Sequence, residues 1–306
     1  MRVAAIDCGT NSIRLLVADV EPGAGAVIDV ERRMEVVRLG EGIDRTGLIS
    51  DAALARTLAA CDDYAAVIAA TRATAVRFVA TSASRDARNR DAFVAGVRAR
   101  IGVEPEVVSG AVEATLSFAG ATGGLRGAEL PYLVVDIGGG STEFVLGTTG
   151  PQAAHSVDVG CVRMTERHLH DDPPTPQQLR TAQADIDAAI GEAGAVVPFD
   201  QARTLVGLAG SVTTVAALAL GLPQYDPTAI HGSRIPADQV RTVTAQLLAM
   251  TRSQRAALPV MHPGRVDVIG AGSLVLQRIL ELTGLPEVLV SERDILDGIA
   301  LSLVPG

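Results

Sequence analysis

Two stretches of the chain share one pattern of apolar and polar positions. Each begins with an apolar run that ends in Asp, passes through a short turn of small residues and resumes as a second apolar run, over residues 3–20 (VAAIDCGTNSIRLLVADV) and 132–149 (YLVVDIGGGSTEFVLGTT). Two apolar runs joined by such a turn predict a β-hairpin. Because the pattern occurs twice, we expect two related domains.

Segments with strand and helix patterns alternate after each hairpin, as in an α/β sheet. In the first half, strands are expected at 26–39, 77–81 and 106–108, and helices at 50–72, 91–100 and 110–120. In the second half, strands are expected at 153–164, 204–208 and 287–290, and helices at 177–193 and 211–220, followed by three further helical stretches. The fold class predicted is α/β.

The domain boundary is expected where the chain becomes rich in glycine. Residues 121–131 (ATGGLRGAELP) end in proline and carry no periodic apolar pattern, which is typical of a connection between domains. We therefore expect a first domain at 1–124 and a second domain at 125–306. Residues 170–176 (HDDPPTP) are expected to form a loop, because proline prevents a helix there.

Composition then restricts the chemistry. The 306-residue sequence has no lysine, so all 26 of its Lys+Arg residues are arginine. A P-loop ATPase, a kinase with a strand lysine and a Schiff-base enzyme each need that missing amine. Catalysis must instead use carboxylates, hydroxyls, backbone amides and guanidinium groups.

Charge and cysteine usage exclude further classes. A net charge of −9 and an aromatic content of 3% argue against nucleic-acid binding. The apolar runs are shorter than the ~18–20 residues of a membrane span, so no membrane segment is expected. Cys8, Cys61 and Cys161 lie far apart without a metal-binding spacing and are expected to be reduced, as in a cytoplasmic protein.

The two hairpin turns carry the candidate chemistry. Backbone N–H groups of glycine-rich turns form concave sites for phosphate. Such sites are expected at Gly9, Thr10, Asn11 and Ser12, and at Gly138, Gly139, Gly140, Ser141 and Thr142. Asp7 and Asp136 precede these turns, and a carboxylate beside a phosphate calls for a cation between them, here Mg²⁺ or Mn²⁺. We expect the two turns to face each other across an interdomain cleft, the alternative being that they are ordinary turns.

A family resemblance rests on seven segments in order along the chain. These are DCGTNSIRLL, ATSASRDARN, SGAVEATL, DIGGGSTEFVLG, VGCVRMTER, GLAGSVTT and SERDILDG. Together they resemble the motifs of the exopolyphosphatase/guanosine pentaphosphate phosphohydrolase family. The resemblance implies two ribonuclease-H-like domains of the actin-like ATPase superfamily, in the short form without extra C-terminal helical domains. It also implies hydrolysis of terminal phosphoanhydride bonds and a homodimer.

The resemblance also implies roles for individual residues. Glu113 matches the general base of the family, although Val112 replaces the acidic residue that usually precedes it. Glu143 matches an acidic residue that orients the attacking water or holds the metal. Arg14 and Arg85 match arginines that contact substrate phosphates. On pattern alone, Glu113 and Glu143 could equally be solvated side chains.

The leading hypothesis is a cytoplasmic, Mg²⁺- or Mn²⁺-dependent exopolyphosphatase that releases orthophosphate from the ends of inorganic polyphosphate. The alternative substrate is guanosine pentaphosphate, and low aromatic content favours the polymer because a guanine pocket often stacks the base on an aromatic ring. A non-catalytic polyphosphate or alarmone sensor is a further alternative.

Two other segments have less certain roles. The spacing of HLHDD (168–172) permits a metal site, but the prolines that follow it favour a loop. The segment GLAGSVTT (207–214) is expected either to bind phosphate or to allow close packing of a strand and a helix.

Overall fold

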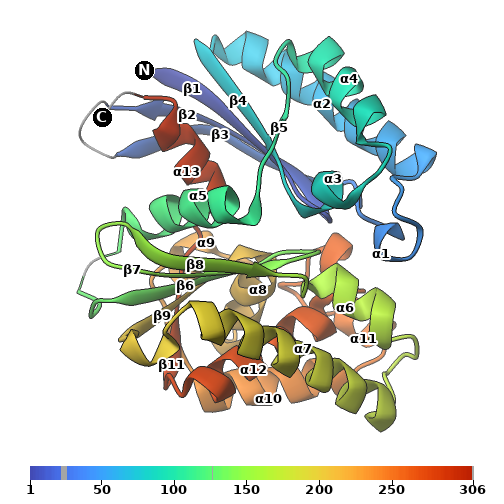
Figure 1. Cartoon of the computed structure of the whole chain (residues 1–306), viewed down its shortest axis with the longest axis vertical. Coiled ribbons are helices and arrows are strands. Elements are labelled where there is room, and N and C mark those ends of the chain that lie inside the picture. Colours follow the sequence, from blue (N-terminus) through green and yellow to red (C-terminus); the bar gives the residue numbers. More distant parts are fainter. Residues whose placement is uncertain (22–25, 126, 305–306) are drawn as a thin grey trace. The chain divides into compact units, whose positions relative to one another are not determined.

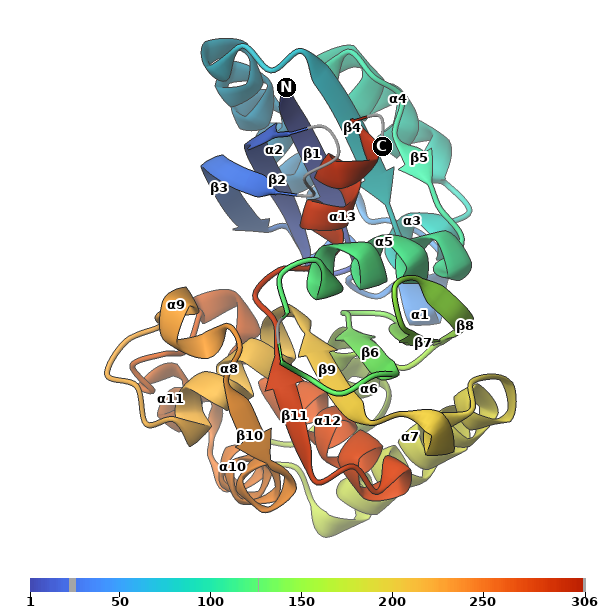
Figure 2. The same ribbon diagram turned by 90° about the vertical axis from the view of Figure 1, so that its left-hand side faces the viewer.

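A computed structural model describes residues 1–21, 26–125 and 127–304 of the chain. The chain divides into two compact units, which Figures 1 and 2 show in two views. Unit 1 comprises Met1–Gly124 and Asp294–Gly306, and unit 2 comprises Leu125–Arg293. Residue 126, which falls in the expected connection between domains, lies outside the described residues.

Unit 1 is built on a five-stranded mixed sheet with the order β3-β2-β1-β4-β5. Its strands are β1 (Arg2–Cys8), β2 (Ser12–Val20), β3 (Val27–Val36), β4 (Ala75–Ala80) and β5 (Glu106–Val107). Strands β1, β2 and β3 pair antiparallel, whereas β4 runs parallel to both β1 and β5. The first predicted hairpin is therefore confirmed as β1–β2.

Helices cover both faces of this sheet. They are α1 (Ile43–Thr46), α2 (Asp51–Thr71), α3 (Ser82–Asp86), α4 (Arg90–Ile101), α5 (Gly110–Thr122) and α13 (Ile295–Ser302). Along β1, Ala4 and Ile6 pack in a core with α2 and α4, while Val3 and Ala5 pack in a second core with α5 and α13. Burial on both faces explains why β1 is a continuous apolar run. Ser50 caps α2 by accepting a hydrogen bond from Ala53 N.

The last helix of the chain belongs to unit 1, so the second domain ends earlier than the sequence indicated. Helix α13 packs against α5, and the two helices approach closely at a pair of glycines. A Cβ at Gly120 would lie 1.8 Å from Asp294 O, and a Cβ at Gly298 would lie 2.0 Å from Leu116 O. A contact this close joins segments far apart in the sequence, and no local pattern indicates it.

Unit 2 repeats the same strand arrangement. Its strands are β6 (Tyr132–Ile137), β7 (Thr142–Gly147), β8 (Pro151–Val157), β9 (Thr204–Leu208), β10 (Arg234–Pro236) and β11 (Glu287–Val290). The sheet order is β10-β11-β9-β6-β7-β8, with β6, β7 and β8 antiparallel and β9 parallel to β6. Read from β8 to β11, this is the order of unit 1, with β10 as an added edge strand. The second predicted hairpin and the repetition are confirmed.

The helices of unit 2 surround one large core on its sheet. They are α6 (Cys161–His168), α7 (Pro176–Val196), α8 (Ala209–Ala219), α9 (Pro227–Ile230), α10 (Ala237–Ala249), α11 (Arg252–Ala256) and α12 (Ile269–Thr283). The predicted strand at 153–164 is wrong in its second half, because β8 ends at Val157 and α6 begins at Cys161. The first N–H groups of this helix bind carbonyl groups of the turn that follows β6.

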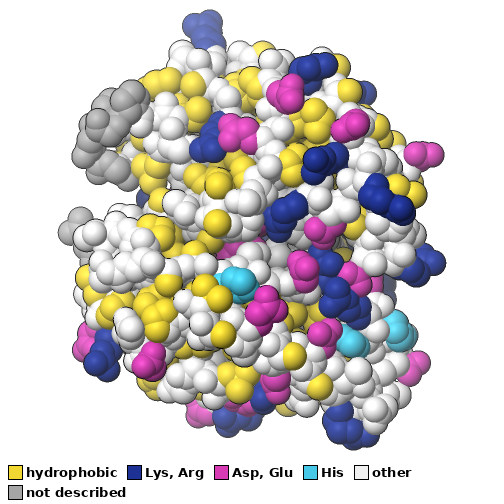
Figure 3. All heavy atoms as spheres, viewed as in Figure 1, with side chains coloured by type: hydrophobic (Ala, Val, Ile, Leu, Met, Phe, Trp, Pro, Cys, Tyr) yellow, Lys and Arg dark blue, Asp and Glu magenta, His cyan; other side chains and the backbone are white. Residues whose placement is uncertain are grey.

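Two properties of the described residues bear on the excluded classes. Over the part of the chain that the structure describes, no helix is both long and apolar enough to cross a membrane. On the face drawn in Figure 3, arginine and carboxylate side chains are interspersed and do not gather into a basic patch of the kind that binds nucleic acid.

Candidate phosphate-binding and catalytic residues

The first turn is held in place through its backbone carbonyl groups. Gly9 N donates to Ser12 O at 3.0 Å, which closes the turn between β1 and β2. The carbonyl of Asn11 accepts from Val37 N at 3.1 Å and from Arg38 N at 2.8 Å. A second segment, which follows β3, therefore fixes the turn in the conformation that an anion would meet.

Thr10, in the same turn, packs closely against that second segment. Its carbonyl accepts from Gly40 N at 2.9 Å, and a Cβ at residue 40 would lie 2.2 Å from Thr10 Cγ2, so only glycine fits there. The Thr10 hydroxyl lies 3.3 Å from that of Ser82. Arg38, in this segment, has a positive φ of 50°, which is rare for a residue other than glycine and marks local backbone strain. Neither Arg38 nor Gly40 was among the predicted site residues.

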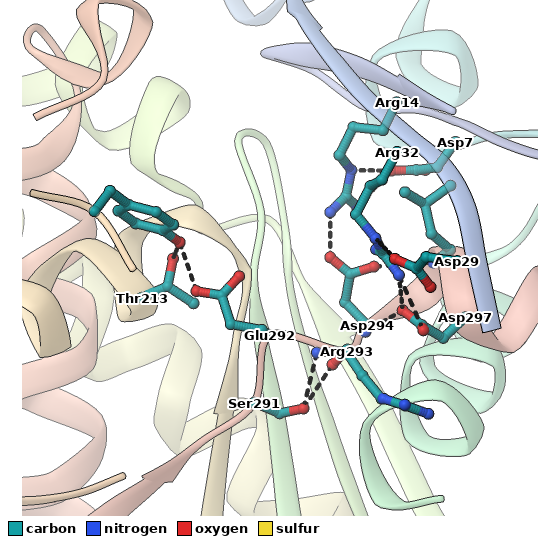
Figure 4. Close-up of polar contacts among 12 residues, drawn as sticks. Asp7, Arg14, Asp29, Arg32, Thr213, Ser291, Glu292, Arg293, Asp294 and Asp297 are labelled. Atoms are coloured by element: carbon teal, nitrogen blue, oxygen red, sulfur yellow. Dashed lines mark hydrogen bonds and ion pairs between the residues drawn. The ribbon is translucent and has the colours of Figure 1, made fainter. Parts of the chain in front are cut away.

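Asp7 and Arg14 are directly opposite each other on β1 and β2, so their side chains share one face of the hairpin. Arg14 donates to Asp7 Oδ2 from Nε at 3.1 Å and from Nη2 at 2.6 Å. Its Nη1 donates to Asp294 Oδ2 (Figure 4). The structure thus places Arg14 between two carboxylates, one of which, Asp294, was not predicted.

Asp7 is almost fully buried, with 3% of its surface exposed, and its Oδ1 has no hydrogen-bond partner. Burial raises the pKa of Asp7, the charge and hydrogen bonds of Arg14 oppose that rise, and the charge of Asp294 adds to it. The Arg14 guanidinium therefore lies beside Asp7 Oδ2, and a metal ion at Asp7 stays a prediction.

Glu113 lies in the first turn of α5, whose N-cap is Ser109. Its side chain is buried, with 8% of the residue exposed, which rules out the alternative of a solvated helix glutamate. Arg85 Nη1 donates to Glu113 Oε2 at 3.1 Å and to Val108 O at 3.0 Å. The Arg85 guanidinium thus holds one oxygen of the Glu113 carboxylate in a fixed position at the start of the helix. The neighbouring Val112 is exposed.

The second turn closes in the same way, with Gly138 N donating to Ser141 O at 3.0 Å. Its carbonyl groups are held by the first turn of α6: Cys161 N donates to Gly138 O at 2.9 Å, and Val162 N donates to Gly139 O at 2.8 Å. This contact explains the helix at 161–168. A Cβ at Gly160 would lie 2.5 Å from Gly139 O, so the helix reaches the turn only because residue 160 is glycine.

Two further side chains complete this arrangement. Arg163 Nε donates to Gly140 O at 2.6 Å, which holds the tip of the turn. The Thr142 hydroxyl donates to Val159 O at 2.6 Å, while its role in phosphate binding stays a prediction. Ser141 is buried and its carbonyl closes the turn.

Asp136 and Glu143 are directly opposite each other on β6 and β7, at the same positions of the hairpin as Asp7 and Arg14. Both are buried, and Glu143 has 1% of its surface exposed, so the alternative of a solvated strand residue is wrong. Ser156 on β8 donates to Glu143 Oε1 at 2.7 Å and orients this carboxylate. The repeated hairpins thus differ in charge at one equivalent position, arginine in unit 1 and glutamate in unit 2.

This difference decides which carboxylates suit a divalent cation. Two acidic side chains placed opposite each other repel unless a cation or a proton lies between them. Mg²⁺ commonly uses one or two carboxylates, with water and phosphate oxygens completing its coordination. Asp136 and Glu143 fit that donor set, whereas Asp7 is paired with Arg14. Among the described residues, no group of three or more His, Cys, Asp and Glu side chains could hold a metal.

The HLHDD segment has structural partners. His168 Nε2 lies 2.8 Å from Asp185 Oδ2, and Asp172 accepts from Arg255 Nη2 at 2.9 Å. Asp171 accepts from the side-chain amide of Gln178 at 3.0 Å. These contacts anchor a loop to the helices around it, in agreement with the loop predicted at 170–176.

The GLAGSVTT segment also makes packing contacts. Ala209 starts α8 with a positive φ of 67°, and a Cβ at Gly210 would lie 2.4 Å from Arg265 Nε. Arg265 Nη1 donates to Thr214 Oγ1 at 3.1 Å. The glycine is therefore needed so that Arg265 can lie against the start of the helix, which favours the packing alternative.

Comparisons with known proteins agree with this geometry. The profile of the Ppx/GppA phosphatase family matches residues 16–306. Exopolyphosphatase 2 of Mycobacterium tuberculosis is 51% identical over 313 aligned positions, which cover 99% of this chain and 98% of that protein. The crystal structure of an exopolyphosphatase-like protein superimposes with a TM-score of 0.96 at 44% identity, covering 99% of this chain and 97% of that one. The Aquifex aeolicus PPX-GPPA enzyme has a TM-score of 0.82 at 28% identity, covering 99% of each chain.

Repeated α/β units with glycine-rich turns and buried carboxylates at the ends of their strands define a phosphate-handling protein of two related domains. The chain belongs to the Ppx/GppA phosphatase family. The α/β fold in two domains that the sequence predicted is confirmed, as is the family resemblance.

Proposed function

We propose that the chain is an exopolyphosphatase, which releases orthophosphate from the ends of inorganic polyphosphate by attack of water on a terminal phosphoryl group. Membership of the family and the similarity to Exopolyphosphatase 2 support this assignment. The observation that carries it is the placement of Glu113, a buried carboxylate at the start of a helix that Arg85 holds in one orientation.

Glu113 is proposed as the general base. A carboxylate that accepts a proton from the attacking water must stay ionised and keep a fixed direction. The Arg85 guanidinium fixes the direction, since it binds Glu113 Oε2 and is itself held by Val108 O. The backbone N–H groups of the turns at 9–12 and 138–141 are proposed to bind substrate phosphates, together with Arg14 and Arg85.

Asp136 and Glu143 are proposed to hold a Mg²⁺ or Mn²⁺ ion, because they form a buried pair of oxygen donors on adjacent strands. Such an ion neutralises charge on phosphoryl oxygens as it develops. Ser156 holds one oxygen of Glu143 by its hydrogen bond.

The aromatic side chains favour polyphosphate over guanosine pentaphosphate. Of the eight Phe and Tyr residues, only Phe199 and Tyr225 are partly exposed. The ring of Phe199 packs on Phe144 at a centroid distance of 5.3 Å, and the guanidinium of Arg265 lies 5.9 Å from the centre of the Tyr225 ring. Each of these two rings already makes a contact within the protein, which leaves little aromatic surface on which a guanine base could stack.

We further infer a cytoplasmic location and a homodimer. The three cysteines are buried free thiols, as is usual in a reducing compartment. Dimer formation follows from the family resemblance, and light scattering during gel filtration would test it.

Measurement of orthophosphate release tests the proposed function, with Mg²⁺ and with polyphosphate or guanosine pentaphosphate as substrate. We expect release from polyphosphate by the wild type. The substitution Glu113→Gln should lower kcat by about 10²- to 10⁴-fold, the range that a positioned general base supplies, while KM changes little. Glu104→Gln is the matched control, because Glu104 is exposed and forms an ion pair with the exposed Arg98.

Three outcomes would each have a different meaning. Release from guanosine pentaphosphate alone would replace the proposed substrate. Binding of polyphosphate without any release would favour a sensor. Release that is unchanged in the Glu113→Gln variant would remove Glu113 from its proposed role.

A further inference from the structure

A chain of charged side chains in unit 1 leads from β3 to the end of β1 (Figure 4). Asp29 accepts from Arg32 Nε at 2.7 Å, and Arg32 Nη2 donates to both oxygens of Asp297 at 3.1 Å. Asp297 in turn accepts from the backbone N of Asp294 at 3.2 Å. Asp294 then binds Arg14, which binds Asp7.

Asp294 is held rigidly within this chain. It is the N-cap of α13, where its Oδ1 accepts from Leu296 N at 3.0 Å, and it forms a reciprocal capping box with Asp297. Only 6% of its surface is exposed. One oxygen of Asp294 thus caps the helix while the other, Oδ2, is directed to Arg14.

The bonds from Arg14 to Asp7 constrain its guanidinium less than a bidentate pair would. Both Nε and Nη2 donate to the same oxygen of Asp7, so they do not form the two-point fork of a bidentate pair. A guanidinium attached to a single oxygen atom can still rotate about that atom. The bond from Nη1 to Asp294 fixes its plane from a separate segment of the chain.

We propose that Asp294 is a positioning residue, which sets the orientation in which Arg14 meets a phosphate of the substrate beside the first turn. The proposal rests on the proposed function, since it concerns how the phosphatase binds polyphosphate. Asp297 supports the same arrangement through its bond to the backbone of Asp294.

A purely electrostatic role for Asp294 leads to the opposite expectation. If the carboxylate merely neutralised Arg14, its removal would strengthen the attraction of a polyanion, and KM for polyphosphate would fall. If it orients Arg14, its removal lets the guanidinium turn away, and KM rises. The sign of the change therefore separates the two roles.

The substitution Asp294→Asn tests the proposal, because asparagine is as good an N-cap as aspartate. When its oxygen caps Leu296 N, its NH₂ group faces the donor Nη1 of Arg14, and the contact is lost. We expect KM for polyphosphate to rise about 10- to 100-fold, the value of a charged hydrogen bond, with a smaller change in kcat. Asp226→Asn is the matched control: it changes the net charge equally, and Asp226 caps α9 in unit 2.

A double-mutant cycle tests whether Asp294 acts through Arg14. In an Arg14→Gln background, Asp294→Asn should alter kcat/KM by less than about threefold, because the group to be positioned is gone. If Asp294→Asn lowers protein yield, Asp294→Ser provides a second variant, since serine also caps a helix and lacks the second oxygen.

The possible failures are distinguishable. If wild type hydrolyses polyphosphate and Asp294→Asn leaves KM unchanged or lowers it, the positioning role is overturned and the proposed function stands. Additive effects of the two substitutions would overturn it as well. If wild type neither hydrolyses nor binds tripolyphosphate in calorimetry, both the proposed function and this inference are overturned.

Discussion

At the scale of single residues, the two hairpins differ most clearly at one equivalent position. Arg14 faces Asp7 in unit 1, and Glu143 faces Asp136 in unit 2. The pair in unit 1 contains a positively charged side chain, whereas the pair in unit 2 places two acidic side chains together in a buried position. We therefore propose the second pair as the site that would hold a divalent cation.

This assignment predicts how the metal requirement responds to substitution. Glu143→Gln removes one negative charge from the pair, so the Mg²⁺ concentration for half-maximal activity should rise by about tenfold or more, as expected for one lost charged contact. Titration of orthophosphate release with Mg²⁺ measures the change. Ser156→Ala, which removes only the hydrogen bond to Glu143, should give a smaller shift. An unchanged Mg²⁺ dependence in Glu143→Gln would contradict the assignment.

His231 predicts a pH dependence of stability. Its Nδ1 accepts a hydrogen bond from Glu292 N at 3.3 Å, and a protonated ring could not accept it. Burial, followed by the charge of Arg293, lowers the pKa of His231. Because the folded pKa is lower than the unfolded pKa of about 6.5, the contribution to stability is complete above that pH and is lost as the pH falls.

The variant His231→Asn keeps an acceptor near the position of Nδ1 and cannot be protonated in this range. Urea denaturation between about pH 5 and pH 8 should show that the wild type loses about a few tenths of a kcal/mol more on acidification than the variant, since solvent screens this half-exposed site. The substitution His170→Asn at an exposed histidine is the control. Equal pH profiles for wild type and His231→Asn would contradict the prediction.

At the scale of elements, the crossing of α5 and α13 depends on two glycines. At Gly120, a methyl group would lie 1.8 Å from Asp294 O and 2.8 Å from Gly298 N, both backbone atoms that cannot move aside alone. The variant Gly120→Ala should therefore lower the free energy of unfolding by about 2 kcal/mol or more. Because the contact is with the carbonyl of Asp294, it should also raise KM for polyphosphate.

Gly123→Ala on the same helix provides the control. Its φ is −60°, and the nearest atom to a new Cβ is Ala119 O at 3.5 Å, an ordinary contact. Alanine there should be neutral or stabilising by about 0.4–1 kcal/mol, since it restricts the unfolded chain. Chemical denaturation of both variants measures the free energy of unfolding. If Gly120→Ala and Gly123→Ala are equally stable, α5 and α13 can move apart without loss of stability, which would contradict the prediction.

At the scale of the whole molecule, the chain leaves unit 1 and returns to it for its last helix. Helix α13 contributes Ile295, Leu296 and Ile299 to the core that also holds Val3 and Leu16. Burial of an aliphatic side chain stabilises a protein by about 1.5–3 kcal/mol, so three such residues account for about as much as the total stability of a typical domain, roughly 5–15 kcal/mol.

A chain truncated after Arg293 should therefore lose the folded structure of unit 1. We expect hydrogen exchange to show loss of protection in β1 and β2 and retention of protection in β6 and β9, whose core lies within unit 2. Protection of β1 that persists in the truncated protein would show that unit 1 folds without α13.

The features predicted from sequence are those that depend on neighbouring residues. Both hairpins follow from local apolar patterns, and the helix that carries Glu113 begins at its own N-cap, Ser109. The family motifs then indicated Glu113, which periodicity alone would have left as a surface residue. Its burial and its contact with Arg85 required the structure.

The features that were missed depend on contacts between distant segments. Asp294 and Arg14 are 280 residues apart, so their contact leaves no local signal. Residues 161–164 continue the apolar pattern of the strand before them at three of four positions, yet they form a helix. The N–H groups of residues 161–163 bind carbonyls of the second turn, which is distant in sequence. The backbone strain at Arg38 likewise reflects its bond to Asn11 and no property of its own sequence.

The return of α13 to unit 1 also sets an order of events during synthesis on the ribosome. All residues of unit 2 are translated before Ile295, Leu296 and Ile299 exist, so the unit that is second in sequence is the first whose core can be completed. Until α13 has been translated, Val3, Leu16 and their neighbours lack the helix that covers them. Nascent unit 1 is therefore expected to be a substrate for chaperones that bind exposed apolar surface until α13 emerges.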